Sequence, residues 1–182
     1  ILRLSETALV WNATHVVQHP VVHKGKNMNE IDKKLSSLGI KLEVPSTPAA
    51  NYIPYSIVGN LVFVSGQLPF QKGKLPITGI VGDEIEIDDA IKMAEICALN
   101  ILSHLKEACK GDLDKVVKVI KLGGFVASSK NFTDQPMVIN GASDLMVNIF
   151  GDKGKHSRFA VGVSSLPRNT PVEVEGIFEI KN

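Results

Sequence analysis

The sequence has few cysteines, few aromatic residues and no excess of charge of either sign. Two of its 182 residues are cysteines, 5% are aromatic, and 20 lysines and arginines stand against 19 aspartates and glutamates. This balance provides no basic surface for RNA or DNA, so we do not expect nucleic acid as a partner. No apolar run approaches the roughly 20 residues that a membrane-spanning helix needs, so we expect no membrane association.

The two cysteines also argue against a disulfide and against a zinc site. Cys97 and Cys109 fall on one predicted helix, where twelve residues separate them by roughly 18 Å, too far for a bridge. The sequence has no CxxC pair, so we expect no bound metal. Two unpaired thiols fit a reducing compartment, and we therefore predict the cytoplasm as the location.

The remaining composition is that of one globular domain, with 44% hydrophobic residues. Residues 1–27 differ from the rest, since they hold Trp11 and three of the five histidines. Met28 opens a stretch that looks like a natural protein start. We therefore predict an N-terminal extension of unclear role over residues 1–27 and a single domain over residues 28–182.

The order of predicted elements indicates an α+β domain. Alternating apolar residues and turn signals predict two main helices and several strands. Asp88 is the expected N-cap of the longer helix, and Gly111 follows its end. A mixed sheet with the helices on one face is the expected architecture. The predicted helices are residues 29–38, 88–110 and 136–150, and the predicted strands are residues 56–58, 61–65, 116–126, 159–163 and 172–180.

Charged residues in the last two strands are the strongest functional signal. Arg158 opens one apolar strand, and Glu173 and Glu175 lie on the next, two residues apart and so on one face. A guanidinium matches the geometry of a carboxylate, and a buried glutamate can move protons. A structural ion pair between Arg158 and a glutamate is the alternative. His156 is expected to be a solvated loop histidine.

Four sequence pieces occur in order along the chain. The first two are Pro54-Tyr55 and Val64-Ser-Gly-Gln-Leu-Pro69. Val116–Lys121 follows the long predicted helix, and the tail combines Arg158 with Leu166-Pro167 and Val172-Glu-Val-Glu175. In this order and at these spacings, the pieces resemble the Rid family of enamine/imine deaminases, also called the RidA/YjgF or endoribonuclease L-PSP family. The resemblance covers residues 52–180, and residues 140–147 and 159–163 indicate a divergent branch of the family.

The resemblance implies a chorismate-mutase-like fold and a homotrimer. Its sheets would form a central barrel, with ligand clefts between subunits. It also implies hydrolysis of reactive 2-imino or enamine acids to 2-oxo acids and ammonia, without a cofactor. By the same resemblance Arg158 binds the substrate carboxylate, Glu173 acts on the attacking water, and Tyr55, Ser65 and Asn140 line the cleft.

One departure from the family pattern narrows the chemistry. Many relatives have cysteine two residues after the arginine, whereas this chain has Ala160. A thiol nucleophile is therefore excluded there, while attack by water remains open. Two other functions remain as alternatives: a non-catalytic trimer that binds small carboxylates or regulates a partner, and cleavage of single-stranded RNA.

Overall fold

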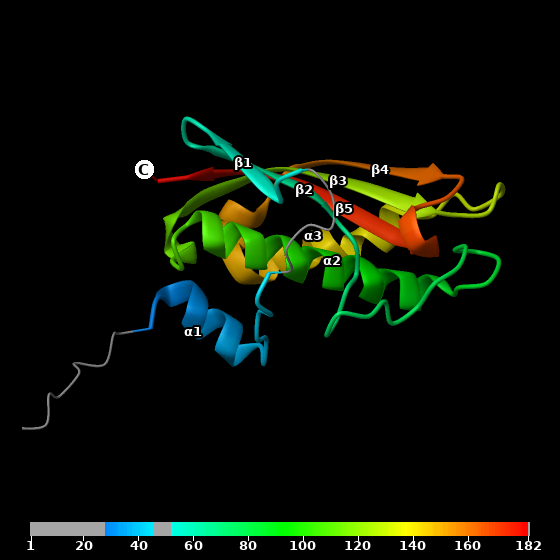
Figure 1. Cartoon of the computed structure of the whole chain (residues 1–182), viewed down its shortest axis with the longest axis horizontal. Coiled ribbons are helices and arrows are strands. Elements are labelled where there is room, and N and C mark those ends of the chain that lie inside the picture. Colours follow the sequence, from blue (N-terminus) through cyan, green and yellow to red (C-terminus); the bar gives the residue numbers. More distant parts are fainter. Residues whose placement is uncertain (1–27, 46–51, 182) are drawn as a thin grey trace, which may run out of the picture.

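The computed structural model describes residues 28–45 and 52–181. The predicted extension, residues 1–27, lies outside this part of the chain. The described residues form a mixed α+β fold, as expected. One five-stranded sheet carries the helices on a single face, and its other face is uncovered (Figure 1).

The sheet is antiparallel except at one edge. Its strand order is β1-β2-β5-β3-β4, and only the β3–β4 pair is parallel among the described strands. A parallel neighbour requires a crossover, and α3 supplies it between β3 and β4. The strands are β1 (Tyr55–Val58), β2 (Leu61–Gln67), β3 (Val116–Ala127), β4 (Ser157–Val163) and β5 (Val172–Ile180).

Two long helices, α2 (Ile87–Ala108) and α3 (Gln135–Phe150), cover one face of the sheet (Figure 1). The apolar stripe of α2, at Ala90, Ala94, Cys97, Ala98, Ile101, Leu102, Leu105 and Ala108, is entirely buried, and Cys109 is also a buried small side chain. Asp88 is not the N-cap, because α2 starts one residue before it. It lies instead in the first turn, where a carboxylate still favours the positive end of the helix.

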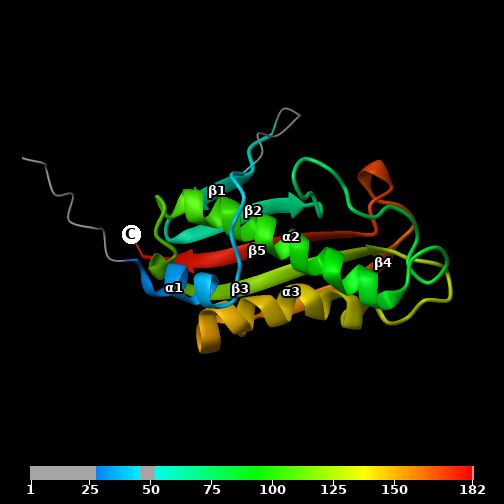
Figure 2. The same cartoon turned by 90° about the horizontal axis from the view of Figure 1, so that it is seen from below.

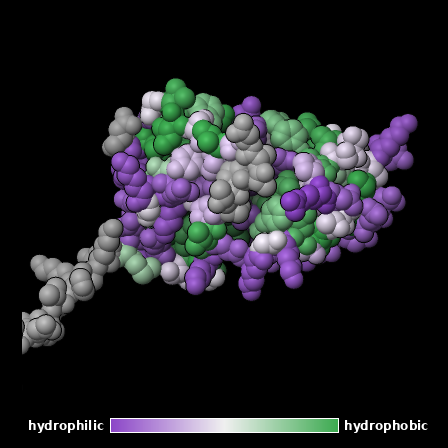
Figure 3. Space-filling model, in the orientation of Figure 1, coloured by the Kyte–Doolittle hydropathy of each residue, from purple (hydrophilic) through white to green (hydrophobic). Residues whose placement is uncertain are grey.

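The two faces of the sheet differ in character. Along β5 every second residue, from Val172 to Ile180, is buried under the helices, and the alternate residues point to the uncovered face. The uncovered positions of β5 carry Glu173, Glu175, Ile177 and Glu179. Apolar side chains are nevertheless exposed over the β1–β2 hairpin, at the upper edge in Figure 3.

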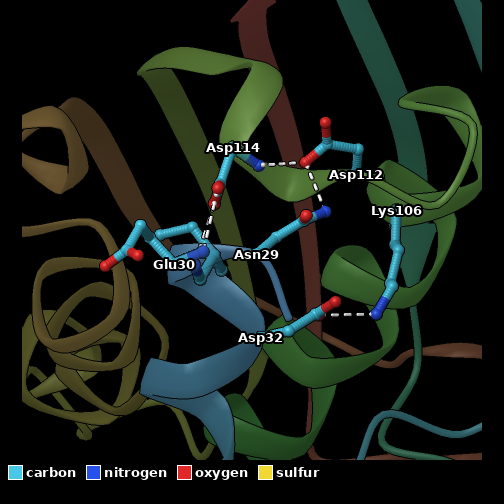
Figure 4. Close-up of polar contacts among 7 residues, drawn as sticks. Asn29, Glu30, Asp32, Lys106, Asp112 and Asp114 are labelled. Atoms are coloured by element: carbon cyan, nitrogen blue, oxygen red, sulfur yellow. Dashed lines mark hydrogen bonds and ion pairs between the residues drawn. The ribbon is translucent and has the colours of Figure 1, made fainter. Parts of the chain in front are cut away.

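The first helix, α1 (Glu30–Ser37), is held by a distant carboxylate. Asp114 lies in the turn η1 (Leu113–Lys115) and accepts hydrogen bonds from the backbone N–H groups of Glu30 and Ile31, at 2.9 and 2.8 Å. The chain then crosses the outer side of α2 on its way to β1 (Figure 2). Two side-chain contacts add to the attachment: Asn29 to Asp112 and Lys106 to Asp32 (Figure 4).

Candidate functional site

The two predicted catalytic residues lie on opposite faces of the sheet. Arg158 is the β4 partner of Leu122, whose side chain is fully buried beneath the helices. Glu173 lies between Val172 and Val174, both buried, so its carboxylate is on the uncovered face. The described chain therefore does not bring Arg158 and Glu173 together.

Arg158 is oriented by α3. Its Nη1 group donates hydrogen bonds to Oδ1 of Asn140 at 2.8 Å and to Oγ of Ser143 at 3.0 Å. Asn140 and Ser143 are three residues apart on a helix and so share one side of it. Asn140, predicted from the resemblance as a substrate contact, thus lies beside the predicted carboxylate-binding arginine. Nη1 carries both bonds, which leaves Nη2 and Nε as the guanidinium donors for a ligand.

A second layer of hydrogen bonds fixes Ser143. Its Oγ lies 3.0 Å from Nε2 of His156, whose Nδ1 lies 2.6 Å from the carbonyl oxygen of Gly154. A carbonyl only accepts, so Nδ1 carries the proton and Nε2 accepts from Ser143 in the neutral ring. The Ser143 hydroxyl then donates to His156 and accepts from Arg158. The expectation of a solvated loop histidine is wrong, because His156 is half-buried and bonded through both nitrogens.

Glu173 lies in a confined and partly desolvated position. A Cβ atom on Gly66 would overlap Oε1 of Glu173, so the carboxylate rests against a bare stretch of β2 backbone. Burial raises the pKa of Glu173, and the charge of nearby Glu175 raises this pKa further. A carboxyl group whose pKa is raised toward neutrality can both donate and accept a proton near physiological pH.

Neither Arg158 nor Glu173 belongs to an ion pair among the described residues. The structural ion pair considered as an alternative is therefore wrong for this part of the chain. Charged groups in partly buried positions usually have a charged partner. Arg158 and Glu173 are therefore the two charged candidates for contact with a ligand.

The other two predicted contacts occupy the hairpin. Ser65 donates its hydroxyl proton to the carbonyl oxygen of Ile53 at 2.9 Å and is next to Gly66 at an irregularity in the β2–β5 register. Tyr55 pairs with Val64, a buried residue, and so points to the helix-covered side of β1. Burial, with a smaller effect from Glu107, raises the pKa of Tyr55. Tyr55 and Glu173 are therefore on different faces.

No group of three or more His, Cys, Asp or Glu side chains within residues 28–45 and 52–181 is arranged to hold a metal ion. The same part of the chain contains no helix long and apolar enough to cross a membrane.

Two polar residues near these features were not predicted. Ser143 could have been found, because its spacing of three from Asn140 places it on the same side of a helix. His104 gives no such signal, because it lies among the apolar residues of α2 and its environment depends on how the segment after β2 packs.

Comparison with known proteins shows similarity of this chain to one family. The family model described as "YjgF/chorismate_mutase-like, putative endoribonuclease" matches residues 32–179. Protein TCP17 of Trypanosoma cruzi is 44% identical over 149 residues, which cover 81% of this chain and 92% of that protein. A 2-iminobutanoate/2-iminopropanoate deaminase of Dermatophagoides farinae is 30% identical over 132 residues, covering 70% of this chain and 87% of that protein.

Solved structures agree with the match. The Agrobacterium tumefaciens protein Atu1372, described as of unknown function, is 49% identical with a TM-score of 0.78. That alignment covers 83% of this chain and 92% of the Agrobacterium chain.

Proposed function

The chain belongs to the YjgF/RidA family, and from this premise we propose that it hydrolyses reactive 2-imino or enamine acids to 2-oxo acids and ammonia without a cofactor. Two charged residues that form no ion pair within residues 28–45 and 52–181 carry the proposal. Arg158 is held by α3 and keeps guanidinium donors for a ligand, and Glu173 is half-buried against Gly66. The first suits a substrate carboxylate and the second suits proton transfer.

We further propose that a homotrimer completes the site. Arg158 and Glu173 occupy opposite faces of one sheet, so a cleft between subunits would combine Arg158 of one copy with Glu173 of another. The uncovered face also exposes apolar side chains, including Phe63 and Val161. Cyclic association would bury such a face. Sedimentation at micromolar concentration tests this, and a stable monomer would contradict it.

The reaction would proceed in two proton-coupled steps. Glu173 would remove a proton from water as its oxygen attacks the carbon of the protonated imine, which gives a neutral carbinolamine. Glu173 would then give this proton to the amino nitrogen. The C–N bond would break as the hydroxyl oxygen becomes the carbonyl of the 2-oxo acid, and the hydroxyl proton would leave with the ammonia as ammonium. Arg158 would hold the carboxylate throughout, and the Asn140–Ser143–His156 contacts would keep the guanidinium in place.

Ammonia release from short-lived imines is the direct test. An amino acid oxidase generates the imine in place, and the rate of 2-oxo acid formation is compared with and without the protein for several amino acids. A faster rate that is lost in an Arg158→Lys variant supports the proposal. No acceleration for any imine, combined with binding of the 2-oxo acids, would favour the non-catalytic carboxylate-binding alternative.

Cleavage of RNA is the weaker alternative, since the chain has no basic excess and few aromatic residues. The cytoplasm remains the predicted location.

A further inference from the structure

His156 lies at the end of a chain of hydrogen bonds that begins at Arg158. Nη1 of Arg158 donates to Oγ of Ser143 at 3.0 Å, and this oxygen lies 3.0 Å from Nε2 of His156. Nδ1 of His156 lies 2.6 Å from the carbonyl oxygen of Gly154. The proposed reaction gives His156 no step of its own. Its ring is nevertheless bonded at both nitrogens, and it reaches the proposed substrate-binding arginine through a single hydroxyl group.

Packing fixes the carbonyl group that accepts the Nδ1 proton. Gly154 is buried at the end of the turn η2 (Gly151–Gly154), directly after α3. A Cβ atom on Gly154 would overlap the carbonyl oxygen of Met146 and Cα of Val147, so only glycine allows the turn to approach the helix this closely. The fold therefore sets the position of this acceptor, and the acceptor in turn selects the ring tautomer with the proton on Nδ1.

The tautomer sets the direction of the other hydrogen bonds in the chain. With its proton on Nδ1, the neutral ring of His156 can only accept at Nε2, so the single hydroxyl proton of Ser143 points to His156. The oxygen of Ser143 then offers lone pairs to Arg158, whose guanidinium can only donate. Serine hydroxyls in helices otherwise donate to the carbonyl oxygen four residues earlier. Without His156 the Ser143 proton would turn to that carbonyl, and the lone pairs would be redirected.

The chain of bonds leaves one edge of the guanidinium for a ligand. Nη1 of Arg158 donates both of its protons, to Oδ1 of Asn140 at 2.8 Å and to Oγ of Ser143. Nε and Nη2 lie on one edge of the planar group, and this edge can hold a carboxylate through two parallel hydrogen bonds. Asn140 is exposed and Ser143 is half-buried. The bond to Ser143 is therefore better shielded from water, and such a bond orients the guanidinium more firmly.

We propose that His156 is a positioning residue for substrate binding. By accepting the Ser143 proton, His156 holds Arg158 with its Nε–Nη2 edge toward the substrate carboxylate. This inference rests on the proposed carboxylate-binding role of Arg158. The alternative is a purely structural role, in which His156 only ties the start of β4 to Gly154. The two roles depend on different ring nitrogens, Nε2 for positioning and Nδ1 for the structural tie, so substitution can separate them.

Two substitutions of His156 test the two nitrogens one at a time. His156→Gln places an amide oxygen near the position of Nε2, so it can still accept from Ser143. His156→Asn places an amide N–H near the position of Nδ1, so it can still donate to Gly154 but leaves Ser143 without its acceptor. Calorimetry with 2-oxobutanoate, a 2-oxo acid, should show near-normal affinity for His156→Gln and affinity about fivefold or more weaker for His156→Asn.

The melting temperature separates this effect from a loss of stability. It should fall at least as much in His156→Gln, which loses the bond to Gly154, as in His156→Asn, so affinity and stability should change in opposite orders. Equal affinity for 2-oxobutanoate in the two folded variants, or weaker affinity in His156→Gln, would overturn the proposal.

Ser143→Ala tests whether His156 acts through the hydroxyl. This variant should bind 2-oxobutanoate about fivefold or more weakly, and adding His156→Asn should weaken binding no further, because both changes remove one contact. Losses that multiply would show that His156 does not act through Ser143. In a steady-state assay, His156→Asn should raise KM for the imine and leave kcat nearly unchanged, since Glu173 handles the proton.

The outcomes distinguish this inference from the proposed function. Binding of 2-oxobutanoate that depends on Arg158 and His156, without imine hydrolysis, contradicts the function and supports the positioning role. Imine hydrolysis with equal 2-oxobutanoate affinity in both His156 variants does the reverse, and absence of 2-oxobutanoate binding by the unchanged protein contradicts both. Should the variants fail to fold, the ring nitrogen resonances of His156 in the unchanged protein must show the proton on Nδ1. A proton on Nε2 would overturn the proposal.

Discussion

Glu173→Gln is the substitution that tests the proposed chemistry most directly. Glutamine keeps the size of the side chain and its fit against Gly66, but it cannot exchange a proton with water or with the leaving nitrogen. General acid–base catalysis contributes at least about 100-fold to typical rates, so we expect turnover to fall by about that factor or more. Carboxylate binding should persist, because Arg158 supplies it.

We expect the same substitution to stabilise the folded protein, although it reduces turnover. Folding raises the pKa of Glu173, so the protonated carboxyl is the form that the fold favours. Its stabilising contribution is complete below the pKa of the unfolded chain and is lost as the pH rises through the raised pKa. Above that point an ionised Glu173 costs free energy, and glutamine removes the cost. Because the site is only half-buried, we expect a gain below about 1 kcal/mol, which raises the melting temperature by up to about 4 °C.

The pH dependence provides the control. The gain of Glu173→Gln in melting temperature should be present at pH 7.5 and disappear below about pH 4, where both side chains are neutral. Glu175→Gln is the matched variant, two residues away on the same face, and it should retain turnover. Normal turnover in a folded Glu173→Gln protein would remove Glu173 from the mechanism. Loss of folding would instead assign Glu173 a structural role.

Three further substitutions test other parts of the structure. Arg158→Lys should reduce imine hydrolysis about tenfold or more in a steady-state assay, because an ammonium cannot form the bidentate hydrogen bonds that a guanidinium forms with a carboxylate. Equal rates would contradict the role of Arg158. Gly66→Ala should displace the carboxylate of Glu173 and reduce turnover with little change in melting temperature; unchanged turnover would show that its placement is unimportant. Asp114→Ala should cost about 1 kcal/mol and speed hydrogen exchange of the α1 amides, and unchanged exchange would refute the cap.

Much of the fold could be predicted from the sequence, because a helix or strand that buries one face has apolar residues at a regular spacing. The stripe of α2 repeats at helical spacing, and β5 alternates between apolar and acidic residues except at Gly176 and Ile177, so both elements follow from the pattern. The short strand β4 carries apolar residues at successive positions from Phe159 to Val161. This pattern does not show which side chains of β4 face the helices, so the side of the sheet on which Arg158 lies could be determined only from the structure.

The polar contacts around the candidate site depend on pairs that are distant in sequence. The hydrogen bond from Asn100 to the carbonyl oxygen of Phe70 joins two segments separated by 30 residues. The relation between Arg158 and His156 depends on Ser143, which belongs to a different element from either. Local spacing identifies side chains that can react, but tertiary packing decides which of them meet.

The cap on α1 has a consequence for the order in which the chain folds. A helix of eight residues is too short to persist alone in water, and the carboxylate that completes its first turn comes from Asp114, 84 residues after Glu30. During synthesis α1 therefore emerges long before its cap exists, and it can become helical only after α2 and the turn at residues 113–115 have formed. The first described helix in the sequence is accordingly not among the first parts of the domain to become ordered.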